Sequence, residues 1–334
     1  MSDNFNALVI NQEGEKFSRE IKKIDKSFLK HGDVLVKVDY STLNFKDALI
    51  LKNGARLVKE FPHIPGIDFA GTVAESKSDK FKEGDEIIQT GWRVGEIFYG
   101  GYSQYAKVDS NFLVKKPKEI TSRQAMMLGT AGLTAIQCAF TTKQTREVLL
   151  LGEKVNDVIV TGASGGVGSI AVMILSKLGC NVTAATTKPN EEYLKSLGAK
   201  NIIKSGDLDK EARPLDKGLY DGAVDTVGGD ILAKILSMIS NNGVVTCCGN
   251  VGGMMFTSSV FPFILRGVQL SGIDSAESSI DLKSELWDLL SDEWFIDLSK
   301  QTKNVKIGNI GPEIEKILKG NQIGRVVIDH GEKI

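Results

Sequence analysis

The feature that most constrains this fold is a glycine-rich turn that joins an apolar strand pattern to an apolar helix pattern. Residues 157–168 read Asp-Val-Ile-Val-Thr-Gly-Ala-Ser-Gly-Gly-Val-Gly, and helical spacing of apolar residues continues over 169–178. Glycines at positions 162, 165 and 168 allow a sharp bend, close approach of the backbone to phosphates and tight seating of the helix on the strand. The pattern predicts a dinucleotide site, and the alternative is a merely tight turn between strand and helix.

The residues after this turn continue the alternation of strands and helices. We predict strands over 181–187 and 201–204, with a helix over 191–197 between them. Later segments predict strands over 222–226, 244–248 and 269–272 and helices over 230–240 and 282–292. Strands that alternate with helices in this way are typical of a doubly wound parallel sheet of the Rossmann type.

The end of the second predicted strand indicates which dinucleotide is bound. A site that prefers NAD usually has a carboxylate about 20 residues beyond the glycines, where it binds the ribose hydroxyls. Here the segment reads Ala184-Ala-Thr-Thr-Lys188, with hydroxyls and a cation instead of an acid. NADPH is therefore favoured, with Thr186, Thr187 and Lys188 as phosphate ligands and Tyr193 as a cover for the adenine. The alternative for Lys188 is an ordinary solvated lysine.

The chain before the turn follows a different pattern. Residues 5 to about 118 alternate short β-like runs, such as Val34-Leu-Val-Lys-Val38, with glycine and proline, which predicts an all-β barrel. Helical spacing begins near Ile120, and residues 134–140 predict a helix. A last strand over 324–329 follows a helix over 312–318 and resembles the barrel sequence again. The chain thus leaves a first domain, forms a Rossmann domain and returns, and its 334 residues suffice for both.

Composition limits the kinds of partner. The 41 basic and 42 acidic side chains nearly cancel, so the net charge of −1 gives no bulk attraction to nucleic acid or to an anionic membrane. No window has the ~18 apolar residues that a membrane helix needs, and the N-terminus has no leader pattern. The four cysteines form no CxxC pair, which favours a reducing compartment. We expect a cytoplasmic protein that acts on a small molecule.

Ordered motifs along the whole chain resemble one family of oxidoreductases. They are Ser41–Ala48, Pro65–Val73, Gly91-Trp92, Gly100–Ser103, Gly129–Ala135, Gly162–Gly168, Glu192–Ala199 and Gly324–Val327. These motifs are similar to those of zinc-independent medium-chain dehydrogenases/reductases, in particular the YhdH/YhfP group of quinone oxidoreductases, which includes AcuI-type acrylyl-CoA reductases. The resemblance implies a GroES-like catalytic domain over 1–124, completed by 300–334, and a Rossmann domain over 125–299. It also implies NADPH between the domains and a homodimer paired through the edge strand 269–272, with a monomer as the alternative.

The sequence lacks the zinc ligands of the alcohol-dehydrogenase branch, where thiolates and an imidazole hold the metal. Asn44 stands at the position of the first cysteine of that branch, and Ile67 precedes Asp68 where that branch has a histidine before a glutamate. No cysteine precedes residue 138, and there is no four-cysteine lobe. We therefore expect neither a catalytic nor a structural zinc.

Without zinc, nothing obvious polarises the oxygen of an alcohol or a simple ketone for hydride transfer. A conjugated acceptor avoids this difficulty, because hydride can add to its β-carbon while charge develops on a carbonyl oxygen held by hydrogen bonds. The resemblance points to reduction of acrylyl-CoA to propionyl-CoA, with a quinone or a free enone as the enzymatic alternative. A non-catalytic NADPH-binding module is the alternative of a different class.

The resemblance also assigns residues to the site. Catalysis falls to Asn44, Asp47 and Thr130, with Asn44 beside the nicotinamide and Asp47 as a structural or proton-relay carboxylate. The cofactor is expected to contact Asn44, Thr130, Gly162, Ser164, Gly165, Gly166, Val167, Gly168, Gly249, Asn250 and Arg325, besides the residues named above. Arg325 either reaches the cofactor or supports the barrel. The substrate is expected at Phe45, Trp92, Arg93 and Tyr99, although aromatic residues beside glycines are as often loop packing.

A coenzyme A thioester would need cations for its phosphate groups. The candidates are Lys46, Lys52, Arg56, Lys59 and Arg93. The alternative is that these charges form an ordinary solvated face.

Overall fold

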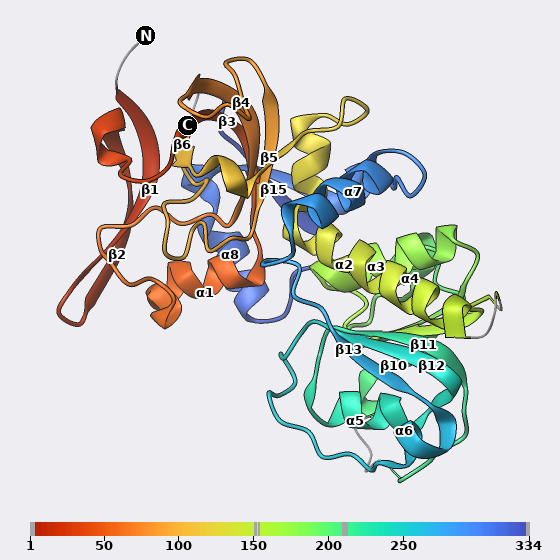
Figure 1. The fold of residues 1–334 in the computed structure, drawn as a ribbon. Helices are drawn as coiled ribbons and strands as arrows, with labels where there is room; N and C mark the ends of the chain where they lie inside the picture. The colour runs from red at the N-terminus through yellow and green to blue at the C-terminus, as the bar shows by residue number, and fades with distance from the viewer. Residues whose placement is uncertain (1–3, 150–151, 153, 209–212, 332–334) are drawn as a thin grey trace. The chain divides into compact units, whose positions relative to one another are not determined.

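The computed structural model describes residues 4–149, 152, 154–208 and 213–331, and the chain divides into two compact units. Unit 1 comprises Met1–Thr130, Ala276–Asp292 and Asp297–Ile334, and unit 2 comprises Ala131–Ser275 and Glu293–Ile296. Figure 1 labels the elements of both units. This division differs from the expected boundaries at 124 and 299, because the segment 276–292 belongs to unit 1, where the Lys283 ammonium donates to the carbonyl of Thr90.

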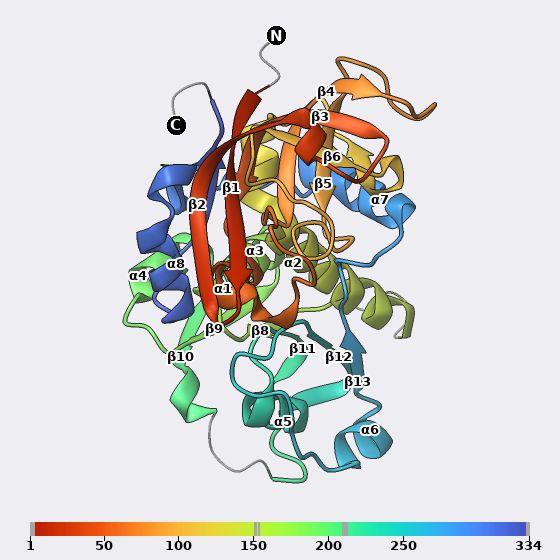
Figure 2. The same ribbon diagram turned by 90° about the vertical axis from the view of Figure 1, so that its left-hand side faces the viewer.

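Unit 1 is built on a mixed sheet. Its strands among the described residues are β3 (Val34–Thr42), β4 (Asp68–Ser76), β5 (Glu86–Thr90), β6 (Tyr105–Val108), β7 (Leu113–Lys115), β14 (Thr302–Lys306) and β15 (Arg325–Asp329). They lie in the order β14-β15-β3-β4-β5-β7, with β6 also paired to β3, and only β14 and β15 run parallel. Alternation in β3 buries Val34, Val36 and Val38 on one face, which explains the predicted strand. A separate hairpin, β1 (Asn4–Glu13) and β2 (Lys16–Asp25), is visible in Figure 2.

Helix α1 (Phe45–Asn53) is a difference from the sequence patterns, which predict short strands and turns in this region. Asn44 is its N-cap, and the Asn44 amide donates to the Asp47 carboxylate one turn later, 2.9 Å away. Gly54, with φ 71°, ends the helix. Ala48, Ile50 and Leu51 are buried in a core shared with α8 (Gly311–Leu318), so tertiary packing adds to the caps. Helix α7 (Ile280–Ser291) also belongs to unit 1.

Unit 2 is a parallel sheet with helices between its strands, as predicted. Its described strands are β8 (Asp157–Val160), β9 (Asn181–Thr186), β10 (Asn201–Lys204), β11 (Tyr220–Asp225), β12 (Ile239–Cys247) and β13 (Gln269–Gly272), in the order β10-β9-β8-β11-β12-β13. Its helices are α3 (Gly166–Lys177), α4 (Glu191–Ser196), α5 (Gly229–Ser237) and α6 (Phe261–Arg266). All strands of this sheet are parallel, but successive strands are added on one side of β8 up to β10 and on its other side from β11 onward. The boundary between β8 and β11 is the topological switch point, where such folds bind ligands.

Helix α2 (Ser122–Leu149) is much longer than the predicted segment 134–140 and contains a break. Gly129 has φ 53° and ψ −153°, which is not helical, and the division between the units falls one residue later. An isolated glycine in an apolar run therefore marks a bend rather than the helix start. No helix among the described residues is long and apolar enough to cross a membrane.

Two buried histidines of unit 1 predict a dependence of stability on pH. Burial lowers the pKa of both His63 and His330 to about 4, so the folded chain stays neutral there while the unfolded chain takes up protons below pH 6.5. Stability present above pH 6.5 should fall as the pH drops toward 4, by roughly 1.4 kcal/mol per pH unit for each histidine. Urea unfolding should show this slope, and His63→Phe, which keeps an aromatic ring against Tyr99, should remove about half of it. An equal slope in both proteins would contradict the assignment.

Candidate active site and nucleotide-binding turn

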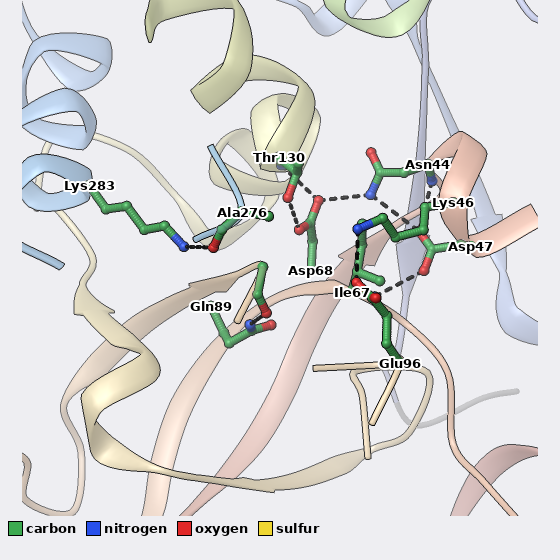
Figure 3. A network of polar contacts seen from close by, with 11 residues as sticks. Asn44, Lys46, Asp47, Ile67, Asp68, Gln89, Glu96, Thr130, Ala276 and Lys283 are labelled. Carbon is green, nitrogen blue, oxygen red and sulfur yellow. Dashed lines mark hydrogen bonds and ion pairs between the residues drawn. The ribbon is translucent and has the colours of Figure 1, made fainter. Parts of the chain in front are cut away.

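Unit 1 contains a buried cluster of polar side chains centred on Asp68, the first residue of β4. The Thr130 hydroxyl donates to Asp68 Oδ1 over 2.5 Å, and the Thr130 amide donates to Oδ2 over 2.7 Å. Asn44 Nδ2 donates to the same Oδ2 over 2.8 Å. Figure 3 shows Asp68 between Asn44 and Thr130. The cluster therefore ties the start of α1 and the bend of α2 to one strand end.

Both the nitrogen and the oxygen of the Asn44 side-chain amide form hydrogen bonds within this cluster. Its Nδ2 donates to Asp47 Oδ2 over 3.2 Å as well as to Asp68, and its Oδ1 accepts from Arg325 Nη2 over 3.2 Å. Both N–H groups therefore face carboxylates, and Asn44 bridges the two acids. This geometry favours an action through Asp68 over direct donation to a ligand.

Arg325, the first residue of β15, is the cation of the cluster and is 4% exposed. Its Nε donates to the carbonyl of Met127 over 2.9 Å, and its Nη2 donates to Thr42 Oγ1 over 3.0 Å. Nη2 also lies 3.3 Å from the carbonyl of Leu128. Of the two roles expected for Arg325, these contacts favour support of unit 1, because they fix the carbonyls just before the bend at Gly129.

The electrostatics of the cluster retain a proton. Burial, and then the negative charge of Asp68, raise the pKa of Asp47 to about 7. Burial also raises the pKa of Asp68, although Thr130, Asn44 and Arg325 act in the opposite direction. Two neighbouring buried carboxylates beside one guanidinium do not both ionise cheaply, so burial and mutual repulsion favour the protonated form of Asp47.

Gly129 is the residue that lets Thr130 reach Asp68. A Cβ at Gly129 would lie 2.6 Å from Asp68 Oδ2 and 2.9 Å from Thr42 Cγ2, and the φ of 53° disfavours any side chain. Asn44, Asp47, Asp68 and Arg325 are buried, whereas Thr130 is partly exposed. Among these five residues, Thr130 is thus the polar group through which the acid pair can reach a ligand.

The expected substrate residues fall into two groups. Phe45 is 41% exposed at the start of α1, and Trp92 and Arg93 follow the end of β5 with consecutive φ values of 52° and 59°. Tyr99 is instead buried in a core cluster, where its hydroxyl donates to the carbonyl of Pro62. Packing within unit 1 therefore accounts for Tyr99.

The cations expected at a coenzyme A site are also differently placed. Lys46 forms an ion pair of 2.8 Å with the nearly buried Glu96. Lys59 donates to the carbonyl of Arg56 over 3.2 Å. Three further candidates are exposed: Lys52, Arg56 and Arg93. Each can contact an anion from solvent.

In unit 2 the glycine turn has the geometry that its spacing predicts. A Cβ at Gly162, where φ is 58°, would lie 2.3 Å from Thr226 Oγ1, and one at Gly168 would lie 2.3 Å from the carbonyl oxygen of Gly162. Packing therefore requires both glycines. At Gly165 the nearest atom would be 3.2 Å away, so the protein itself demands glycine less there, and close approach of a ligand remains the better reason.

The residues expected at the adenine ribose gather at the end of β9. Ser164 Oγ lies 2.7 Å from Thr186 Oγ1, which also accepts from the backbone amide of Lys188 over 3.1 Å. Thr187 is exposed, Lys188 is half-buried with its pKa lowered by burial, and Tyr193 is half-buried on α4. Gly249 and Asn250 follow β12, and a Cβ at Gly249 would lie 2.0 Å from the carbonyl oxygen of Thr226. The glycine turn, Ser164 and the end of β9 together fit a dinucleotide with a 2′-phosphate.

Two acidic residues of these sites, Asp68 and Asp225, were not predicted from the sequence. Asp68 was predicted only as the neighbour of a missing zinc ligand, although an acidic residue directly before the apolar residues Phe69-Ala70 indicates a buried carboxylate. Asp225, at the end of β11, is buried and accepts from Thr161 Oγ1 over 2.6 Å and from the Gly228 amide over 2.8 Å. It orders the loop beside the glycine turn. Within the described ranges, no group of three or more His, Cys, Asp or Glu side chains could hold a metal ion.

A β-rich unit with a bent helix, joined to a parallel sheet with a glycine turn at β8, defines the class of two-domain dehydrogenases and reductases. The chain matches the alcohol dehydrogenase GroES-like domain over residues 30–118 and the zinc-binding dehydrogenase model over residues 166–292. The acrylyl-CoA reductase AcuI of Ruegeria pomeroyi is 40% identical over 97% of this chain and 99% of that protein. The protein YhfP of Bacillus subtilis, named as a quinone oxidoreductase, is 40% identical over 98% and 99%.

Solved structures agree. The yhdH oxidoreductase of Salmonella enterica in complex with NADP superimposes with a TM-score of 0.90 at 38% identity, covering 97% of this chain and 99% of that one. The yhfP protein of Bacillus subtilis with NAD bound gives a TM-score of 0.93 at 38% identity, with coverage of 98% and 100%. The chain therefore belongs to the zinc-independent medium-chain dehydrogenases/reductases, in the YhdH/YhfP group, and is an oxidoreductase. The predicted GroES-like and Rossmann folds are confirmed.

The bend at Gly129 can be tested by stability. We expect Gly129→Ala to lose at least about 2 kcal/mol more than Gly84→Ala, because the added methyl group displaces the buried Asp68 carboxylate from its donors. Gly84 is a matched control, since its φ of 87° is also left-handed but nothing lies within 4 Å of its Cβ position. The free energy of unfolding of the two variants, measured in urea, gives the comparison. Equal losses would mean that the bend tolerates a side chain.

Proposed function

We propose that this protein reduces acrylyl-CoA to propionyl-CoA with NADPH and without a metal, by addition of hydride to the β-carbon. The observation that carries the proposal is the acid pair of Asp47 and Asp68, in which Asp68 accepts from the hydroxyl of Thr130, a partly exposed residue. Reduction of a conjugated thioester consumes one hydride and one proton, and this cluster holds a proton near neutral pH. The name of the AcuI relative supports the thioester as the substrate.

NADPH is the cofactor that the residues of unit 2 favour. Hydroxyls and Lys188 at the end of β9 suit a 2′-phosphate, and the glycine turn leaves room for a pyrophosphate at Gly165. When bound, the reduced nicotinamide supplies the hydride, while the chain's own residues bind, orient and deliver the proton. In this scheme Thr130 is the residue of unit 1 that contacts the nicotinamide end, and Asn44 acts through its hydrogen bond to Asp68.

In the proton step that we propose, the Thr130 hydroxyl gives its proton to the α-carbon of the substrate as charge leaves the thioester oxygen. For this step the one proton of the acid pair must be on Asp68, which passes it to the Thr130 oxygen over their 2.5 Å contact. Asn44 carries no proton itself, because it contacts both Asp47 and Asp68 and holds the two carboxylates at a fixed spacing. After this step both carboxylates are ionised, and a proton from solvent, which enters at the partly exposed Thr130, restores the singly protonated pair.

A quinone or a free enone is the alternative acceptor, and the name of the YhfP relative favours it. A quinone or a free enone carries no phosphate group, so its reduction needs no cation site of this kind. An NADPH-binding module without turnover is the alternative outside enzymes.

The proposal extends to assembly and location. Strand β13 ends the parallel sheet, and an apolar surface follows β12, with Met254 84%, Met255 85% and Ile264 68% exposed. An unpaired strand edge next to apolar side chains suits a second copy related by a twofold axis, so we propose a homodimer. All four cysteines are free thiols, which is consistent with a reducing cytoplasm.

The proposed reaction predicts a preference among acceptors. The kcat/KM for acrylyl-CoA with NADPH should exceed that for 1,4-benzoquinone or a short free enone at least about tenfold, and a chelator should not change it. NADH should be the poorer donor. Preference for the quinone or free enone would overturn the thioester assignment, and NADPH binding without turnover of any acceptor would favour the binding module.

Lys188 provides a test of the cofactor. Lys188→Ala should raise the KM for NADPH about tenfold while the KM for NADH changes less than about twofold, because only NADPH carries the 2′-phosphate. The control is Lys195→Ala, which removes an exposed lysine of the neighbouring helix α4 that pairs with Glu192. A parallel change for both nucleotides would make Lys188 an ordinary solvated lysine.

Assembly gives a further prediction. Wild-type protein should elute with light scattering at twice the mass of the chain, and Ile264→Asp should shift it to one chain, since a buried charge at a dimer contact is unfavourable. Ile323→Asp, at a residue of unit 1 that is 43% exposed, is the control and should stay dimeric. A wild-type mass of one chain would refute the homodimer.

A further inference from the structure

The turn after β5 is strained in a way that glycine would relieve. Trp92 has φ 52° and Arg93 has φ 59°, and in the described part of the chain only Arg56 and Asn242 are other non-glycine residues with positive φ. Each such residue costs about 1–2 kcal/mol relative to glycine. Residues in such conformations persist only where the surrounding structure holds them, and they cluster at functional sites, so the contacts of Trp92 and Arg93 indicate what this turn does.

The backbone of this turn is fixed by several contacts. The Gln89 side chain donates to the carbonyl of Gly91 over 2.8 Å, and the Trp92 amide donates to the carbonyl of Ala276 over 3.2 Å. A Cβ at Gly91 would lie 2.4 Å from that Ala276 oxygen, so the two chain segments touch directly. The Trp92 ring stacks on Phe112, with centroids 5.7 Å apart and planes 9° from parallel. The turn is therefore rigid on both its backbone and its aromatic side.

Lys283 of α7 joins these contacts. Its side chain is 1% exposed, and its Nζ donates to the carbonyls of Thr90 over 2.6 Å and Ala276 over 2.8 Å. The same Nζ lies 4.7 Å from the centroid of the Trp92 ring. Figure 3 shows the side chain extended toward Ala276. One buried cation thus binds the residue before the turn, the segment beside it and the indole within it.

Arg93 is the part of this turn that faces outward. Its carbonyl accepts the amides of Glu96, Ile97 and Phe98 over 3.1, 2.9 and 3.2 Å, so its backbone is held, while its side chain is exposed. A guanidinium on a fixed backbone loses less freedom when it forms the bidentate contact that phosphates favour.

We propose that Lys283 is a positioning residue for substrate specificity, which holds the Trp92–Arg93 turn so that Arg93 binds a phosphate of a coenzyme A thioester. This inference rests on the proposed function for the identity of the substrate. It adds that discrimination between a thioester and an uncharged enone depends on a buried cation that does not touch either one.

The test compares Lys283→Met and Lys283→Arg with Arg93→Ala and with the double variant Lys283→Met/Arg93→Ala. Lys283→Met should raise the KM for acrylyl-CoA about tenfold, with kcat within about threefold, and should weaken binding of propionyl-CoA by calorimetry to the same degree. The loss in kcat/KM should be at least about fivefold larger for acrylyl-CoA than for methyl vinyl ketone. Lys283→Arg, which keeps donors for both carbonyls, should restore most of the affinity. Lys300→Met, at an exposed lysine of the same unit, should behave like wild type.

The double variant separates positioning from general damage. If Lys283 acts through Arg93, Lys283→Met should cost less than about twofold more in propionyl-CoA affinity once Arg93 is alanine. Equal losses on both substrates, additive losses in the double variant, or unchanged affinity in Lys283→Met would each overturn the inference. If Lys283→Met does not fold, Lys283→Arg and Arg93→Ala decide, because normal affinity in Arg93→Ala would also overturn it.

Failure of the proposed function has a different signature. If wild-type protein binds propionyl-CoA but does not reduce acrylyl-CoA, the proposed reaction is wrong. The propionyl-CoA affinities of the variants would still decide the role of Lys283. Wild-type protein that does not bind propionyl-CoA would overturn the inference itself.

Discussion

The hydrogen bonds to the buried carboxylate of Asp68 are the constraint on which unit 1 depends. They join β4 to the N-cap of α1 through Asn44 and to the bend of α2 through Thr130, and Arg325 of β15 links the same Asn44 to the carbonyls before the bend. An acid without these donors would be costly to bury. The chain therefore reaches its fold only if segments distant in sequence converge on one side chain, and this convergence also produces the site.

Burial of Asp68, which joins three elements of unit 1, also changes the acidity of the two carboxyl groups. Low polarity raises the pKa of both acids, and Asn44 keeps them close enough that the charge of Asp68 adds to the shift at Asp47. In the proposed reaction, this acid pair supplies the proton that Thr130 passes to the substrate. Stability and reactivity are thus properties of one hydrogen-bond network, so that substitutions at Asn44 should change both together.

The sequence predicted the parallel sheet of unit 2 closely because each buried strand, such as Val158–Val160, carries its own apolar run and glycine punctuation. Helix α1 was not predicted, because its apolar spacing is weak and its signals are only the cap at Asn44 and the glycine at position 54. The full length of α2 was not predicted, because Gly129 interrupts the helical pattern. Residues that act through distant partners, Asp68 and Lys283, could not be found locally, because their donors and acceptors come from segments up to about 190 residues away.

One position that supplies a zinc ligand in the related alcohol-dehydrogenase branch here contacts the residue that follows another such position, Ile67. Asn44, at the position of the first cysteine, donates to Asp68, whose carboxylate in turn accepts from Thr130. A metal at such a place would stabilise charge on a substrate oxygen directly, whereas an amide and two carboxylates can only store and pass a proton. In the proposed reaction this difference favours substrates whose charge can spread away from the reacting carbon, and we propose that side chains such as Arg93 recognise the rest of the molecule.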